Sequence, residues 1–443
     1  MHITDINTAS PPLSVVRIEV ERLFGRYTYI LTRKDNSSQL DSSFIILYGD
    51  NGSGKTTILK LLFHLLSPKQ KCDHHLFLAQ TPFSRFSVVL ANGTSIIATR
   101  TDSNLLGTFQ IQILQGSYLF QEIVQIEAEN RKTQDYEFYQ HLTKLQLNLF
   151  LLDDDRRLKS DFFEEETRDY QPNSMKKFLF INPFFEDRTN ITRETALKLS
   201  IARTEDWIRE QALKGANQGV ENIHSIYEDI IAQIFHDADK VYDDFPQSPQ
   251  SMDILINELR SYESRSKEFS HFGLMSPLMT QKIVQILQVN TQINDSIIRN
   301  ILKPYLDSIA ARFNALQKTK DLLSLFENTI NKFLHDKHLT LHIKDGMRIV
   351  TDTGEELSSE MLSSGEKQLL LLFCNTLTAR DRATIFIIDE PEISLNIKWQ
   401  RQLIRALLEL TKDSQIQFIV ATHSIELLSQ YKTNVVKLAN IGK

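Results

Sequence analysis

The sequence predicts an α/β protein with a mixed sheet flanked by helices, a small antiparallel sheet beside it, and a large all-helical insertion. Short apolar runs near both ends, such as Phe44–Tyr48 and Thr384–Asp389, predict the strands. A long polar middle with few glycines predicts the insertion. We therefore expect two halves of one head, residues 1–119 and 336–443, separated by a helical insertion over residues 120–335.

Composition narrows the class of protein. The chain has 443 residues, of which 41% are hydrophobic and 24% charged, as in an average globular protein. Its net charge of −6 gives no general attraction to nucleic acid, so DNA binding would need a local basic patch. Only two cysteines are present, too few for a closed zinc module and consistent with a reducing compartment.

Strand signals fall at both ends of the chain. The alternating run from Val15 precedes Phe44–Tyr48, and three β-rich segments follow at 86–90, 94–99 and 108–114, with Asn92-Gly93 as a hairpin turn. Near the C-terminus, 338–343 and 347–351 predict a second hairpin. The runs TIFIID and IQFIVAT then alternate with helices, which predicts parallel strands.

The middle predicts helices over 192–213, 219–236 and 281–334. In the last, apolar residues follow steps of three, four or seven, which makes one continuous stripe. These residues are Ile293, Ile297, Ile301, Tyr305, Ile309, Phe313, Leu316 and Leu323. The stripe fits a packed helical bundle and a short coiled-coil arm equally well, so both remain open. The stretch 245–249 predicts a turn, and the charged segment 153–169 predicts a solvated linker or helix face.

A glycine-rich loop joins the strand Phe44–Tyr48 to a helix. Residues 49–56 match G-x-x-x-x-G-K-[ST], in the strand and helix context that phosphate binding requires. Backbone N–H groups of such a loop cradle phosphates, the lysine reaches the β and γ phosphates, and the threonine hydroxyl faces Mg²⁺. The predicted phosphate site comprises Gly49, Asp50, Asn51, Gly52, Ser53, Gly54, Lys55, Thr56 and Thr57.

The run Ile385–Glu390 predicts an apolar strand that ends in two carboxylates, Asp389 and Glu390. We expect Asp389, together with Thr56, to hold Mg²⁺. Glu390 comes next and is placed to polarise the attacking water, the role that phosphoryl transfer needs from a base or orienting group.

The segment LSSGEKQ, residues 362–368, resembles the signature motif of ABC-type ATPases, and it precedes the acidic strand as in that family. Pro391 and Ser394-Leu395-Asn396 resemble the D-loop. His423, after the last long apolar run, resembles the switch histidine that senses the γ-phosphate. The fold that this resemblance implies is a P-loop ABC-type ATPase head, with Glu390 and His423 as its catalytic residues.

The resemblance also implies a homodimer that encloses ATP and Mg²⁺, and assemblies beyond a dimer stay open. Residues Ser363, Ser364, Gly365 and Glu366 of one subunit would complete the γ-phosphate site of the other. Position 364 is serine where many family members have glycine, and a glutamate at position 366 is common in the SMC and DNA-repair branch. The Q-loop glutamine stays open among Gln80, Gln110 and Gln112, and the adenine contact among Arg22, Arg26 and Tyr27.

More than 300 residues separate Lys55 from Ser363, far more than in transporter subunits, so the chain resembles the SMC/OLD class of ABC-type ATPases. Within that class it is similar to ATPase subunits of anti-phage systems of the Septu or PARIS type. The resemblance implies a regulator or sensor for a separate effector, such as a nuclease. The alternative is an SMC-like repair or recombination ATPase acting directly on DNA.

No signal peptide or membrane-spanning run is expected, because the apolar runs fall short of the roughly 18 to 20 residues that a spanning helix needs. The predicted location is cytoplasmic, without a membrane partner.

Overall fold

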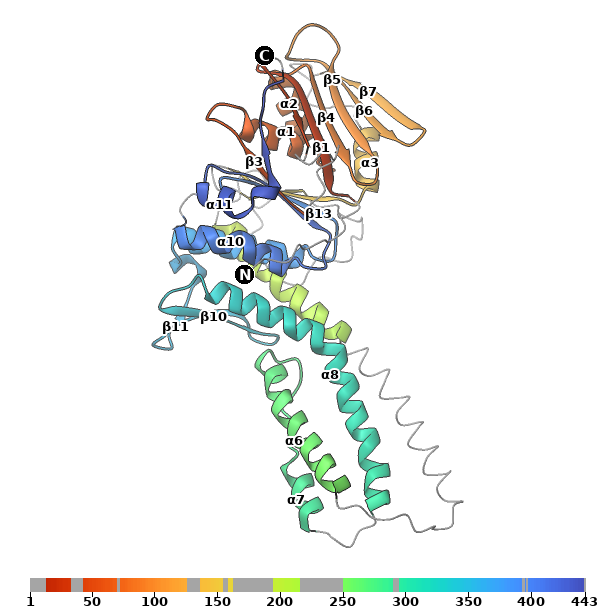
Figure 1. Ribbon diagram of the computed structural model, residues 1–443, viewed down its shortest axis with the longest axis vertical. Coiled ribbons are helices and arrows are strands. Elements are labelled where there is room, and N and C mark those ends of the chain that lie inside the picture. Colours follow the sequence, from red (N-terminus) through yellow and green to blue (C-terminus); the bar gives the residue numbers. More distant parts are fainter. Residues whose placement is uncertain are drawn as a thin grey trace, which may run out of the picture. The chain divides into compact units, whose positions relative to one another are not determined.

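The computed structural model (Figure 1) describes residues 13–32, 43–69, 72–125, 136–153, 158–161, 194–215, 250–289, 295–392, 395 and 397–441. The chain divides into two compact units. Unit 1 comprises Met1–Gln171, Asp187–Leu197 and Ser363–Lys443, and unit 2 comprises Pro172–Glu186 and Lys198–Leu362. Each unit is built differently, unit 1 around two sheets and unit 2 mainly from helices.

The central sheet of unit 1 has six strands in the order β15-β3-β14-β13-β8-β9. Its members are β15 (Val435–Lys437), β3 (Phe44–Tyr48), β14 (Ile416–Ala421), β13 (Thr384–Asp389), β8 (Asn148–Leu152) and β9 (Leu158–Asp161). All neighbours are parallel except β8 and β9. The largely apolar strands β8, β13 and β14 are buried along their whole length, as expected for a parallel sheet with both faces covered.

Helices of unit 1 follow these strands in the α/β pattern that the sequence predicted. Helix α1 (Lys55–Leu66) begins directly after the glycine-rich loop and contacts β8, β13 and β14. Helices α9 (Ser364–Thr378), α10 (Ile397–Leu410) and α11 (Ile425–Gln430) alternate with β13 and β14. The described part of this unit also contains α2 (Cys72–Gln80), α3 (Tyr136–Lys144) and a short 3-10 helix, Lys432–Asn434.

A second sheet of unit 1 is antiparallel, with the order β2-β1-β4-β5-β6-β7. It contains β1 (Val15–Leu23), β2 (Tyr27–Leu31), β4 (Arg85–Leu90), β5 (Ser95–Arg100), β6 (Phe109–Gln115) and β7 (Tyr118–Val124). Alternate residues enter a core shared with α1. The three predicted strands and the turn at Asn92-Gly93 are confirmed, with Gly93 at a φ of +84°.

The structure differs from the sequence-based division at the start of the insertion. Residues 120–335 were expected to be all-helical, but β7 continues to Val124, and β8 and β9 belong to the central sheet. The segment Asn148–Leu152 is short and apolar from Leu149 onward, which fits a fully buried parallel strand better than a solvated helix.

Unit 2 contains the long helices α6 (Gln250–His271) and α8 (Asp295–Asn331), which contact each other, and the shorter α7 (Gln281–Val289). Of the predicted stripe on α8, Ile309, Phe313, Leu316 and Leu323 are buried, whereas Tyr305 is 40% exposed. The side chains of Ile293, Ile297 and Ile301 lie outside the description. Pro304 lies inside α8.

Unit 2 also has a three-stranded sheet made of β10 (Lys337–His342), β11 (Gly346–Thr351) and β12 (Glu356–Leu357). This confirms the second predicted hairpin. The sheet lies in unit 2, although the sequence-based division put residues 336–443 together in the head. Its first strand contacts α8, and the side chain of Glu205 accepts a hydrogen bond from the N–H of Met347 at 2.8 Å.

The predicted helix over 192–213 is helical at 194–215. The predicted helix 219–236 and turn 245–249 lie outside the described residues, as does most of the charged segment 153–169. Among the helices that the structure describes, none combines the length and apolar character needed to cross a membrane.

Candidate functional site

The glycine-rich loop between β3 and α1 has a backbone that only glycine accommodates without strain at two positions. Gly52 and Gly54 have φ of +77° and +91°. A Cβ on Gly54 would lie 2.8 Å from a methyl carbon of Leu23. The phenol of Tyr29 donates a hydrogen bond to the carbonyl of Ser53 at 3.0 Å, which ties the loop to β2.

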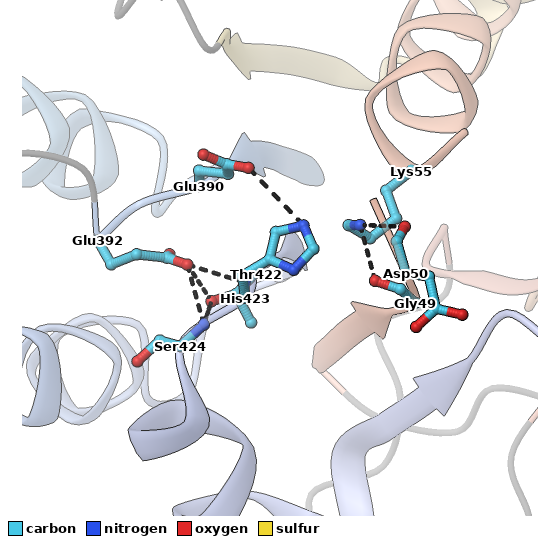
Figure 2. Close-up of polar contacts among 8 residues, drawn as sticks. All are labelled: Gly49, Asp50, Lys55, Glu390, Glu392, Thr422, His423 and Ser424. Atoms are coloured by element: carbon cyan, nitrogen blue, oxygen red, sulfur yellow. Dashed lines mark hydrogen bonds and ion pairs between the residues drawn. The ribbon is translucent and has the colours of Figure 1, made fainter. Parts of the chain in front are cut away.

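Lys55, the first residue of α1, is only 6% exposed. Its Nζ donates hydrogen bonds to the carbonyls of Gly49 at 2.8 Å and Asp50 at 3.0 Å, so the lysine bends back over the loop (Figure 2). Burial lowers the pKa of Lys55 from its ordinary 10.5, and the carboxylates of Glu390, Asp389 and Asp50 act in the opposite direction.

The acidic pair lies at the carboxyl end of β13. Asp389 is its last residue and is 4% exposed. Glu390 follows in the left-handed region with a φ of +48°, and its N–H donates to the carbonyl of Ala421 at 2.9 Å. This conformation is uncommon for residues other than glycine, and the hydrogen bond to the neighbouring strand β14 holds it here.

His423 follows β14, and its Nε2 lies 4.0 Å from Oε1 of Glu390. In the view of Figure 2 the imidazole lies between Glu390 and Lys55. The ends of β3, β13 and β14 thus bring together Lys55, Glu390 and His423, which are far apart in the sequence. The carboxyl edge of a parallel sheet is where α/β proteins commonly bind ligands.

The predicted signature segment forms the start of α9. Ser363 is its N-cap: its hydroxyl accepts from the N–H of Glu366 at 3.3 Å, and the Glu366 carboxylate accepts from the N–H of Ser363 at 2.8 Å. This reciprocal pair is a capping box. Ser363 and Ser364 are exposed, whereas Gly365 and Glu366 are buried. The glutamate at position 366 therefore fixes the backbone of the segment.

Other predicted residues lie in different places. Gln80 ends α2, and Gln110 and Gln112 lie on β6 of the antiparallel sheet, so none of the three belongs to or directly follows a strand of the central sheet. Arg22, Arg26 and Tyr27 lie at the turn between β1 and β2, whose neighbours Leu23 and Phe24 approach Gly54. Of the D-loop positions, Pro391 and Leu395 are described, and Ser394 and Asn396 lie outside the description.

Two carboxylates near this edge were missed by the sequence reasoning. Glu392 accepts three hydrogen bonds from the loop that contains His423. Asp153 follows β8, the parallel neighbour of β13, and pairs with Lys60 of α1 at 2.9 Å and with Lys159 at 3.4 Å. The buried apolar run before Asp153, like the one before Asp389, is the signal that would have found it.

The residues present fit ATP with Mg²⁺. Lys55 directs two of its three N–H groups to carbonyls within the described chain, and a third donor suits a phosphate oxygen. No group of three His, Cys, Asp or Glu side chains suited to a metal occurs in the described part. One carboxylate, Asp389, with the hydroxyl of Thr56 suits Mg²⁺, which usually keeps waters and takes phosphate oxygens as further ligands.

The fold and the site define a P-loop nucleotide-binding protein. The chain belongs to the AAA ATPase domain family, which matches residues 33–428. This match confirms, at the level of the family, the prediction of a P-loop ATPase head that uses ATP.

Individual relatives are more distant. A putative ABC transporter ATP-binding protein of Clostridium acetobutylicum is 23% identical over 173 residues, which are 39% of this chain and 59% of that protein. Two solved Smc head domains also align. That of Pyrococcus furiosus, with an extended coiled coil and bound to the C-terminal domain of ScpA, is 15% identical with a TM-score of 0.34, covering 96% of this chain and 95% of its own. That of Pyrococcus yayanosii, with a coiled coil and joint, is 13% identical with a TM-score of 0.35, covering 96% and 94%.

Proposed function

We propose that the chain hydrolyses ATP with Mg²⁺, and that two copies close around the nucleotide to control a separate effector, such as a nuclease of an anti-phage system. The observation that carries the ATPase part is the meeting of Lys55, Glu390 and His423 at one edge of the central sheet. The effector and the defence role rest on the sequence resemblance.

The roles follow from position and charge. The loop 49–54 and the first turn of α1 present N–H groups to the phosphates, and Lys55 adds a positive charge. Mg²⁺ held by Thr56 and Asp389 would neutralise charge on the transferred phosphate. Glu390 is an acceptor for a proton of the attacking water, and His423, beside it, donates to the γ-phosphate.

Glu390→Gln tests the chemical step. The amide keeps the size of the side chain but is a poor base, so ATP turnover should fall by about 10² to 10⁴ while ATP still binds. Glu356→Gln, at an exposed glutamate of β12 in unit 2, is the matched control and should keep normal turnover. Turnover at the normal rate in Glu390→Gln would remove this residue from the reaction.

Ser363→Arg tests the ATP-dependent dimer. Ser363 is exposed at the start of α9, so a bulky cation there should block a partner subunit without disturbing ATP binding in its own subunit. Sedimentation in the Glu390→Gln background, with and without ATP, reports the dimer. Ser103→Arg, in an exposed loop after β5, serves as the control. An ATP-dependent dimer that survives Ser363→Arg would contradict the proposed arrangement.

The effector is tested by tagging the chain at its native locus and identifying what co-purifies, with and without Glu390→Gln. A stoichiometric nuclease or toxin supports the regulatory role. A repair ATPase would instead show hydrolysis that DNA stimulates and that salt suppresses, because bound phosphates release counterions.

A further inference from the structure

Glu392 lies two residues beyond Glu390, and its side chain reaches the loop after β14. Its Oε1 accepts hydrogen bonds from the hydroxyl of Thr422 at 2.5 Å, the N–H of His423 at 2.9 Å and the N–H of Ser424 at 3.1 Å (Figure 2). One carboxylate oxygen therefore binds three consecutive residues centred on His423. Hydrogen bonds to an ionised acceptor are stronger than neutral ones, so this contact fixes the backbone of that loop.

Gln400 of α10 makes a second connection between the same two loops. Its Oε1 accepts from the hydroxyl of Ser424 at 3.0 Å, and its Nε2 donates to the carbonyl of Leu395 at 3.0 Å. The Ser424 hydroxyl in turn accepts from the N–H of Leu427 at 3.4 Å and caps α11. The loop after β13 and the loop after β14 are thus joined by two side chains.

The imidazole of His423 is less constrained than its backbone. The side chain is 37% exposed, and in the part of the chain that the structure describes its polar side-chain contact is the 4.0 Å approach to Glu390. Where the ring lies therefore depends on the main chain to which it is attached. That main chain is held by Glu392.

We propose that Glu392 is a positioning residue, which holds the backbone at His423 so that the imidazole faces the γ-phosphate. The proposal rests on the proposed ATPase function. It assigns Glu392 no contact with ATP. Its effect on catalysis passes through His423, and displacement of such a group by about 1 Å is enough to cost roughly a hundredfold in rate.

Glu392→Ala should therefore lower kcat about 10- to 100-fold and leave the ATP dissociation constant within about threefold of the wild type. Glu392→Gln retains an acceptor oxygen of the same reach and should recover most of the lost rate. If the role of Glu392 were purely structural, Glu392→Ala would instead lower the free energy of unfolding, and kcat would not fall selectively while the ATP dissociation constant stays the same. An unchanged kcat in folded Glu392→Ala overturns the proposal.

A double-mutant cycle with His423→Ala tests whether Glu392 affects kcat through His423 or independently of it. If Glu392 acts through the histidine, Glu392→Ala should have little further effect on kcat once His423 is alanine. Equal losses in both backgrounds overturn the proposal. If Glu392→Ala does not fold, Glu392→Asp replaces it in the cycle, because the shorter side chain keeps the charge but cannot reach all three donors.

The same assays distinguish the failure of this inference from that of the proposed function. A wild-type protein without ATPase activity, or a Glu390→Gln variant with normal turnover, contradicts the function itself. Normal kcat in Glu392→Ala, with the wild type active and Glu390→Gln inactive, contradicts only the positioning role.

Discussion

Two basic side chains of unit 1 are almost equally buried but are held in different ways. Lys55 is 6% exposed and Arg100 is 7% exposed. The guanidinium of Arg100 donates to five carbonyls, those of Leu78, Ala79, Thr81, Phe83 and Gly107, at 2.6 to 3.3 Å. Lys55 donates to two carbonyls of its own loop.

The number of bound carbonyls distinguishes a cation with a structural role, Arg100, from a cation that can bind a ligand, Lys55. Arg100, the last residue of β5, ties that strand to the C-terminal end of α2, and its guanidinium lies 4.4 Å from the ring centroid of Phe83. Burial lowers its pKa to about 10, and the carbonyls compensate for much of that cost. Lys55 keeps an N–H group suited to a phosphate and lies near the carboxylates of Glu390, Asp389 and Asp50.

Arg100→Met should have the largest effect on stability. Methionine has a similar length but no donors, so several buried carbonyls lose their partners, and we expect the free energy of unfolding to fall by at least about 3 kcal/mol. The folded fraction should still bind ATP. Urea denaturation measures the change, and Arg405→Met, at an exposed surface pair, should cost less than about 0.5 kcal/mol. A loss below about 1 kcal/mol for Arg100→Met would contradict the structural role.

Lys55→Met should show the opposite pattern. Loss of a charged donor to the phosphates removes about 3 kcal/mol of binding, so ATP affinity should fall at least about 100-fold. The free energy of unfolding should change by less than about 1 kcal/mol, because only two carbonyls lose a partner, those of Gly49 and of the exposed Asp50, and a buried charge is removed with them. Calorimetric titration with ATP measures the affinity. Unchanged binding would remove Lys55 from the site.

Much of this site was predictable from local sequence. The strands β3, β13 and β14 are short and largely apolar, and Gly49, Asp389 and Thr422 lie at or just after their ends, so the strands and the residues that follow them were predictable. Strand β8 was missed because its four apolar residues, Leu149–Leu152, lie within a long polar region. Glu392 was missed because its role depends on residues about 30 positions away that meet it only in the folded sheet. The capping box at Ser363 and Glu366 does follow a local pattern and was open to prediction.

Tyr29→Phe should have the smallest effect of these substitutions. The buried phenol binds the carbonyl of Ser53, and its loss should lower the free energy of unfolding by about 1 kcal/mol and weaken ATP binding only a few-fold.

The same substitution should change how stability depends on pH. Burial raises the pKa of Tyr29 to about 12, whereas the phenol of the unfolded chain ionises near pH 10. The wild type therefore loses stability as the pH rises from 10 to 12. Unfolding at pH 8 and 11 should show a shallower decline in Tyr29→Phe, although Tyr431, whose pKa is also raised to about 12, retains its own contribution. An identical decline in both proteins would mean that the Tyr29 phenol does not stay protonated in the folded state.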